Sequence, residues 1–242
     1  MSLAINMLRL RVDPEALVRF VQAQGLNHAN DEDLGYAIHA WLSACFGEWA
    51  PKPFRVLNKP DSRMELLAYS AHDNAALTRL IGQAQPAARE ALCPGTLAYA
   101  AMPQQWQIGA RFGFELLACP VTRQRQAEKD VFLRRLEALP EGETAPERGT
   151  VYREWLAAQL EGAATLESFD LEGFHLVRVL RRTQPTPRAR TRSIPVITRP
   201  RALCRGTLKV ADPERFRALL ARGVGRHRAF GYGMLLLRPS AV

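Results

Sequence analysis

The chain has 242 residues, 47% of them hydrophobic, and a formal net charge of +9. This length and apolar content exclude a disordered chain and fit one large domain or two small ones. The first residues, MSLAINML, lack the basic start and apolar length of a signal peptide, and no apolar run approaches the roughly 18 residues of a membrane span, so we expect a cytoplasmic protein with no membrane partner.

Hydrophobic periodicity in the first half predicts alternating strands and helices. In chain order we expect a strand over residues 7–12, a short helix over 13–20, a helix that ends near Gly47, strands over 54–57 and 64–69, a helix over 75–83 and a strand over 96–102. The second helix is the clearest, because Ile38, Trp41 and Cys45 recur at helical spacing. Asp31 or Asp33 can cap its start. The order β-α-β-β-α-β is the split βαβ arrangement of ferredoxin-like domains.

A similar order begins again in the second half. The expected elements are a strand over 107–118, helices over about 126–138 and 148–160, strands over 174–180 and 207–210, a helix over 213–222 and a last strand over 234–237. We therefore predict an α+β fold of tandem ferredoxin-like (βαββαβ) domains, over residues 1–103 and 104–242.

Positive charge is concentrated in the second predicted domain. The segment from Gly173 to the C-terminus has sixteen Lys or Arg and two acidic residues, or +14, so residues 1–172 carry −5. This asymmetry indicates a polyanionic partner, either nucleic acid or an anionic membrane surface, and a basic surface that serves only solubility is the alternative.

Residues 181–201 are rich in arginine and proline. Because proline disfavours a packed helix, we expect a protruding hairpin or loop here, with a flexible connector as the alternative. An arginine-rich hairpin can lie along phosphates. The candidate RNA contacts are Arg181, Arg182, Arg188, Arg190 and Arg192.

The segment GVGRHRAFGYG, residues 223–233, interleaves glycines with cations between a predicted helix and the last strand. Dinucleotide-binding and P-loop motifs run from strand to helix, so the helix-first order excludes both. Glycines let backbone amides approach an anion closely, and arginines add donors for phosphate. We predict a phosphate-binding loop, with a glycine-rich helix end as the alternative. Its candidate residues are Gly223, Gly225, Arg226, His227, Arg228, Gly231 and Gly233.

His39 is the histidine that the helical pattern distinguishes. It lies roughly 120° from the centre of the apolar stripe of its helix, so a core position is not expected. Tyr36, three residues earlier, falls on the same flank, and the two side chains can face one site. A surface or capping role for His39 is the alternative.

A histidine and a tyrosine beside bound RNA suit a cleavage that needs no metal. The 2′-hydroxyl attacks the adjacent phosphate, and the reaction requires a base for that hydroxyl, an acid for the 5′-oxygen and cations for the developing charge. His39 can perform either proton transfer near neutral pH, and the sequence leaves open which one. No acidic cluster of the two-metal type is evident and the four cysteines stand singly, so we expect no metal and no cofactor.

The C-terminal residues GVGRHRAFGYGMLLLRP resemble the glycine-rich signature of the repeat-associated (RAMP) proteins. With GYAIHAWLSACFG and PKPFRVL, the chain is similar over essentially its whole length to the CRISPR-associated endoribonucleases of type I-E systems, the CasE family. The resemblance implies binding of the CRISPR repeat RNA stem-loop, cleavage at the 3′ base of the stem with a 2′,3′-cyclic phosphate left behind, and retention of the guide RNA beside other Cascade subunits. It also implies that Tyr36 and His39 are the catalytic pair and that Arg123 contacts RNA.

Two other classes of function stay open. The chain could be a non-catalytic RNA-binding RAMP subunit of a CRISPR ribonucleoprotein, with the same fold and no cleavage. It could also be a partner of the ribosome or of a membrane surface that uses its basic half as an electrostatic patch. A strong preference for one stem-loop sequence would exclude the second class, because phosphate contacts alone carry no sequence information.

Overall fold

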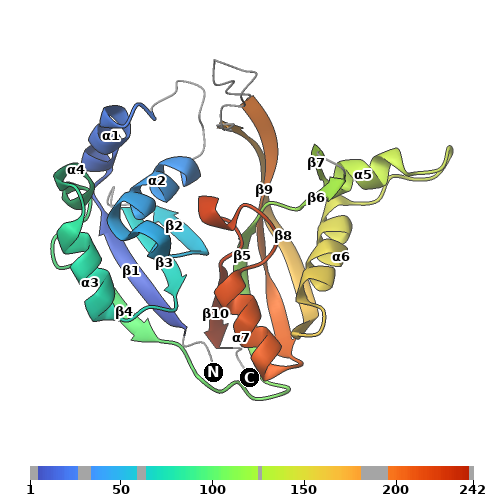
Figure 1. Ribbon diagram of the computed structural model, residues 1–242. Coiled ribbons are helices and arrows are strands. Elements are labelled where there is room, and N and C mark those ends of the chain that lie inside the picture. Colours follow the sequence, from blue (N-terminus) through green and yellow to red (C-terminus); the bar gives the residue numbers. More distant parts are fainter. Residues whose placement is uncertain (1–4, 27–33, 59–63, 125–126, 181–195, 240–242) are drawn as a thin grey trace.

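The computed structural model describes residues 5–26, 34–58, 64–124, 127–180 and 196–239 (Figure 1). Two four-stranded antiparallel sheets form its framework, and helices cover one face of each. The predicted α+β fold of two ferredoxin-like units is confirmed by their strand orders. None of the helices in these segments is long and apolar enough to cross a membrane.

The first unit matches the predicted element order closely. It contains β1 (Asn6–Val12), α1 (Pro14–Ala23), α2 (Gly35–Phe46), the short 3₁₀ helix η1 (Gly47–Trp49), β2 (Phe54–Asn58), β3 (Met64–Ser70), α3 (Asn74–Gln83), α4 (Pro86–Glu90) and β4 (Ala98–Ala101). The strands lie in the order β2-β3-β1-β4, and all neighbours are antiparallel. Alternate residues of β1, including Leu8 and Leu10, enter a core with the helices, which therefore share one side of the sheet.

Local capping explains where the first helices begin. The Asp13 carboxylate accepts hydrogen bonds from the amides of Glu15 and Ala16 at the start of α1. At α2 the N-cap position is held by Leu34, in place of the predicted Asp31 or Asp33, which lie outside the described residues. Burial of the apolar stripe of α2 stabilises this helix without that cap.

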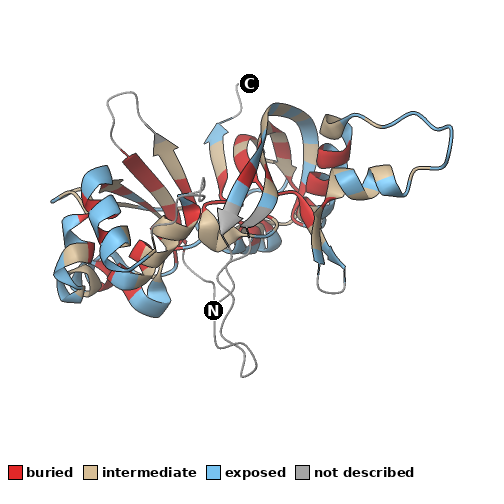
Figure 2. Ribbon diagram, turned by 90° about the horizontal axis from the view of Figure 1, so that it is seen from above, coloured by how far each residue is buried: buried red, intermediate tan, exposed pale blue. Residues whose placement is uncertain are grey.

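The second unit repeats the topology with an insertion. It contains β5 (Arg111–Ala118), β6 (Val121–Gln124), β7 (Ala127–Asp130), α5 (Val131–Glu137), α6 (Arg148–Leu160), β8 (Ala164–Leu180), β9 (Val196–Val210), α7 (Pro213–Arg222), the 3₁₀ helix η2 (Arg228–Phe230) and β10 (Leu235–Pro239). Its strand order is β10-β5-β9-β8, and residues of α6 and α7 pack on this sheet in one core. The exposed segment between α5 and α6 projects away from the body (Figure 2).

Two expectations for this unit were wrong in extent. Residues 127–130 form β7, which pairs with β6 as a hairpin, and the helix begins only at Val131, where the Asp130 carboxylate accepts from the Phe132 amide. Strand pairing overrides the helical propensity of this polar stretch. Strands β8 and β9 are also longer than predicted. Two register shifts in β8, at Leu166/Ser168 and Leu171/Gly173, interrupt the alternation of buried and exposed residues by which a strand is recognised in a sequence.

The two units contact each other through apolar residues and a hydrogen bond. Met7, Leu67 and Tyr69 leave the first sheet on the face opposite its helices and pack against the core of the second unit. The Tyr69 hydroxyl donates to the carbonyl of Leu235 at 2.9 Å. The division near residue 103 falls between β4 and β5 and stays a prediction.

Candidate functional site

The loop over residues 223–233 joins α7 to β10 and is closed by its own backbone. The Val224 amide donates to the Gly233 carbonyl at 2.8 Å, and the Gly233 amide donates to the Leu117 carbonyl of β5 at 2.8 Å. A further bond, from the Phe230 amide to the His227 carbonyl at 2.8 Å, forms η2. The glycine loop is therefore an ordered structure anchored on the second sheet.

Two of its glycines are required by geometry. Gly233 has φ +80°, and a Cβ there would lie 2.3 Å from the Val224 carbonyl oxygen. Gly231 has φ +88°, and its Cβ would lie 3.2 Å from the Phe54 ring of β2. These glycines let the loop fold and approach the first unit. The predicted role of the loop glycines in phosphate binding is a separate matter and stays a prediction.

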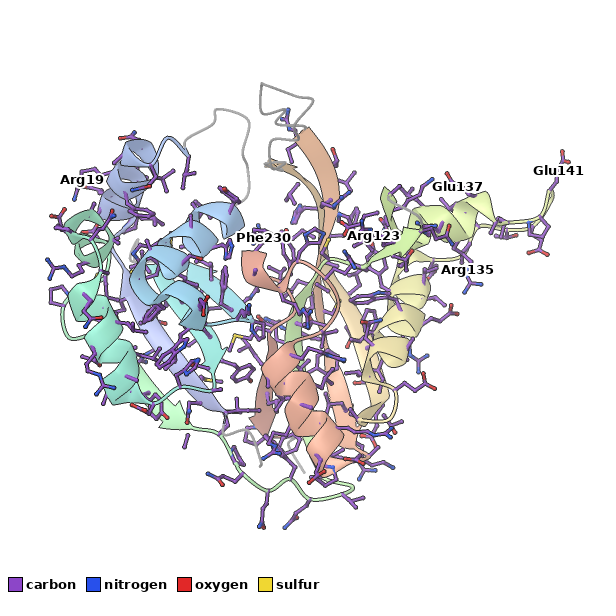
Figure 3. The ribbon with its side chains drawn as sticks, viewed as in Figure 1. Arg19, Arg123, Arg135, Glu137, Glu141 and Phe230 are labelled. Atoms are coloured by element: carbon purple, nitrogen blue, oxygen red, sulfur yellow. The ribbon has the colours of Figure 1, made fainter. Side chains whose placement is uncertain are left out.

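Phe230 brings the glycine loop to α2. Its ring centroid lies 5.3 Å from that of His39 in an edge-on arrangement and 6.2 Å from that of Tyr36 in a stacked one. Figure 3 shows Phe230 between α2 and the strands of the second unit. The sequence analysis assigned His39 and the loop to separate domains, and the structure places them in one site between the two units.

His39 is half-buried on the flank of α2, as its helical angle predicts. Burial lowers the pKa of His39 below its usual 6.5, and the charge of Lys52 lowers it further. The imidazole is therefore mainly neutral near pH 7, which is the form that accepts a proton.

The cations of the loop converge on a carboxylate that the sequence analysis did not identify. Arg226 Nε donates to Glu128 Oε1 at 2.7 Å, and His227 Nε2 lies 2.9 Å from Glu128 Oε2. Arg199 Nη2 of β9 donates to the same Oε2 at 3.1 Å. Arg228 is held differently, because its Nη1 donates to the Arg222 carbonyl at 2.8 Å.

Opposing effects act on the pKa values of the Glu128 and His227 pair. Burial by itself would raise the pKa of Glu128, but His227 and the hydrogen bond from Arg226 outweigh it and lower the pKa. Burial lowers the pKa of His227 more than Glu128 raises it. Glu128 is thus ionised at neutral pH, and His227 is mainly neutral and donates through Nε2 when it carries its proton there.

Of the remaining predicted RNA contacts, the structure describes Arg123 and not the arginines between 181 and 192. Arg123 of β6, labelled in Figure 3, is exposed. It pairs with Glu128 across the hairpin, and residues directly opposite in an antiparallel pair have their side chains on the same face. The β8 and β9 arms pair up to Leu180 and Val196. The candidates between them, Arg181, Arg182, Arg188, Arg190 and Arg192, lie outside the described residues.

Within the part of the chain that the structure describes, no three His, Cys, Asp or Glu side chains gather in a way that could hold a metal ion. Cys45, Cys119 and Cys204 are buried thiols, and Cys93 is half-buried.

Comparison with known proteins identifies relatives in sequence and fold. A family model described as CRISPR associated protein matches residues 7–239, and no curated protein matches the chain. The CRISPR endoribonuclease Cse3 bound to a 19-nt RNA is 21% identical with a TM-score of 0.62, over 98% of this chain and 100% of that chain. Cse3 from Thermus thermophilus, bound to an RNA representing a pre-cleavage complex, is 19% identical with a TM-score of 0.61 over the same shares. A chain of a CRISPR RNA-guided surveillance complex is 15% identical with a TM-score of 0.58, over 97% and 100%.

Proposed function

This chain belongs to the CRISPR associated protein family, and on that basis we propose that it is an endoribonuclease that cleaves CRISPR precursor RNA at the 3′ base of the repeat stem-loop. The observation that carries the proposal is the contact of Phe230 with Tyr36 and His39. Through it, a proton-transfer group of the first unit lies beside the cationic loop of the second, where an RNA backbone can meet both.

The proposed reaction is attack of a ribose 2′-hydroxyl on the adjacent phosphate. His39 is the general base, because its lowered pKa keeps the imidazole ready to accept the proton of the 2′-hydroxyl. Tyr36 assists from one helical turn earlier. Arg226 and the other loop cations stabilise the charge that develops on the phosphate. The bond to the 5′-oxygen then breaks, this oxygen takes up a proton from water, and the products are a 2′,3′-cyclic phosphate and a 5′-hydroxyl.

All of these groups belong to the chain itself, and we propose that the reaction needs no metal. The side chains supply the base and the positive charge that a metal ion would otherwise supply. The protein would act in the cytoplasm on the repeat RNA, contacting it through the glycine loop, Arg123 and the 181–192 arginines.

We further propose that the protein retains the guide RNA beside other Cascade subunits. The fold likeness to a chain of a CRISPR RNA-guided surveillance complex supports this proposal. A non-catalytic RNA-binding subunit with the same fold is the competing function, and cleavage itself distinguishes the two.

The first experiment incubates the wild type and His39→Ala with a labelled CRISPR-repeat stem-loop in EDTA. A second RNA carries a 2′-deoxy sugar at the nucleotide 5′ to the cut. We expect the wild type alone to cleave, only the unmodified RNA, and to leave a cyclic phosphate. Binding of the stem-loop without cleavage would support the non-catalytic alternative, and equal binding of any RNA sequence would support a general electrostatic patch.

A further inference from the structure

Glu128 is the point at which three separate parts of the RNA-binding surface meet. It lies on β7 of the inserted hairpin and contacts His227 and Arg226 of the glycine loop and Arg199 of β9. The Glu128 and Arg199 side chains are each 11% exposed, whereas that of Arg226 is 43% exposed. The carboxylate thus sits in a nearly closed position behind a cation that faces solvent.

The hairpin that carries Glu128 is itself anchored. The neighbouring Asp130 is buried and accepts a hydrogen bond from Arg148 Nη1 at 2.7 Å and one from the Tyr152 hydroxyl. The Arg148 guanidinium also lies over the rings of Phe132 and Phe174, 3.9 and 4.0 Å from their centroids. Glu128 is therefore presented from a fixed element to a loop.

The loop backbone at this contact is strained. His227 has φ +59° although it carries a side chain, a left-handed conformation that residues other than glycine keep only where the surrounding structure holds them in it. The contact between His227 Nε2 and the Glu128 carboxylate holds the His227 side chain and so supports this backbone conformation. The strained residue precedes η2, which carries Phe230 to the α2 site.

The contact also fixes the direction of Arg226. Glu128 binds Nε, and no other hydrogen bond to the Arg226 guanidinium is found within the described ranges. Its two terminal nitrogens form the edge that pairs with two phosphate oxygens, and this edge is left available on a half-exposed side chain.

We propose that Glu128 is a positioning residue for RNA: its negative charge, although unfavourable near a phosphate, holds Arg226 with its terminal nitrogens directed outward. This inference rests on the proposed function. It predicts an effect opposite in sign to that of simple electrostatics. Removing one negative charge from an RNA-binding surface should strengthen binding, whereas loss of a positioning carboxylate should weaken it.

The test compares Glu128→Gln with Glu154→Gln, using the CRISPR-repeat stem-loop as the probe. Glu154 is the matched control, because it also pairs with an arginine, Arg135, and its loss changes the net charge equally. We expect the Kd of Glu128→Gln to rise roughly five- to tenfold and that of Glu154→Gln to stay constant or fall. At saturating RNA the single-turnover cleavage rate of Glu154→Gln should equal that of the wild type, and that of Glu128→Gln should fall by a smaller factor than its Kd rises, because His39 is untouched. A Kd for Glu128→Gln at or below that of Glu154→Gln would overturn the proposal.

A second measurement separates positioning from loss of folding. In the Arg226→Ala background, Glu128→Gln should weaken binding no further, because the side chain it positions is gone. A loss of the same size in both backgrounds would mean that Glu128 supports the fold only. If the wild type neither binds nor cleaves the stem-loop, the proposed function fails. If it does both and the two glutamine variants behave alike, only the role of Glu128 fails.

Discussion

The two units share one topology and supply different parts of the site. In both sheets the first strand lies between the third and the fourth, and the second lies at the edge beside the third. The first unit contributes His39 and Tyr36 from a helix that follows its first strand. The second contributes Arg226 and Phe230 from the loop before its last strand. In the proposed function the chemistry therefore resides in the segments that connect the strands, and the shared framework sets where these segments meet.

The units also differ in what was added to the framework. The second unit carries the β6–β7 hairpin and α5 between β5 and α6. This insertion places Glu128 against the glycine loop. The first unit has only helices between its paired strands, with α1, α2 and η1 between β1 and β2 and with α3 and α4 between β3 and β4. We infer that proton transfer needs one well-placed helix, whereas holding a polyanion needs several elements brought together.

The largest expected effect tests this division at His39. His39→Ala should lower the single-turnover cleavage rate roughly 10²- to 10⁴-fold, because the proposed general base is lost, and should leave the Kd for RNA unchanged. Rates and binding curves with the repeat stem-loop measure the two separately. His175→Ala, which removes an exposed histidine from β8, is the control and should cleave normally. A parallel loss of binding in His39→Ala would contradict the division.

The next effect concerns the loop that joins the units. Gly233→Ala should reduce the free energy of unfolding by about 1–3 kcal/mol and also impair RNA binding, because the new Cβ would lie 2.3 Å from the Val224 carbonyl. Gly142→Ala is the matched control, since Gly142 has φ +90° and nothing within 4 Å of its Cβ position. Chemical denaturation compares the variants. Equal destabilisation would mean that backbone conformation alone, and no packing, requires the glycine.

Arg226→Ala should have the reverse signature of His39→Ala. We expect the Kd to rise about tenfold and the dependence of log Kd on log salt to weaken by about one phosphate contact. The cleavage rate at saturating RNA should fall far less than in His39→Ala, because other loop cations remain to stabilise the charge that develops on the phosphate. Arg19→Ala removes an exposed cation of α1, far from the site in Figure 3, and should leave both quantities as in the wild type. A salt dependence equal to that of the wild type would exclude a phosphate contact.

Local signals predicted those elements that are determined locally. Helix α7 begins and ends where the sequence indicated, because Asp212 caps it, Pro213 occupies the first turn and Gly223 ends it. The β6–β7 hairpin was missed, because its pairing overrides the helical preference of the same residues. Arg226 and His227, which contact Glu128, are 98 and 99 residues from it in the sequence, and no local sequence pattern predicts contacts at that separation.

The same reasoning explains what was seen of the site and what was not. Tyr36 and His39 were recognisable as a pair because helical spacing alone places them on one flank. Their contact with Phe230 depends on how the two units pack, through Tyr69 and its neighbours, and that packing is set by the tertiary structure. The sequence therefore indicated the Tyr36 and His39 pair and the glycine loop separately, and the contact between them appears only in the structure.

Phe230→Ala directly tests the contact between the glycine loop and the Tyr36 and His39 pair. An aromatic pair contributes about 0.5–1.5 kcal/mol, so we expect a two- to tenfold lower cleavage rate. Binding should change less, because the loop cations remain. Phe112→Ala, which removes another ring from the second unit away from α2, is the control for general loss of packing. An unchanged cleavage rate in Phe230→Ala would show that the ring contact does not align the two halves.

The smallest expected effect is a shift in the pH profile. If His39 is the base, the cleavage rate rises with pH through the pKa of His39, which lies below 6.5, and is constant above it. Lys52 contributes to that lowering, because its positive charge disfavours the imidazolium. From η2 the Phe230 ring, which carries no charge, lies edge-on to the imidazole. Lys52→Gln should therefore move the midpoint of the profile to higher pH, whereas Lys52→Arg should keep it in place.

Burial is the larger cause of the lowered pKa and is untouched by these substitutions, so the midpoint in Lys52→Gln should remain below 6.5. Single-turnover rates measured across the acid range distinguish the outcomes. A rate that falls as pH rises through the same midpoint would make His39 the acid for the 5′-oxygen, and the base would have to be sought elsewhere in the site. A profile identical in all three proteins would mean that Lys52 does not act on the group that limits the rate, although the lysine and the catalytic helix belong to the same unit.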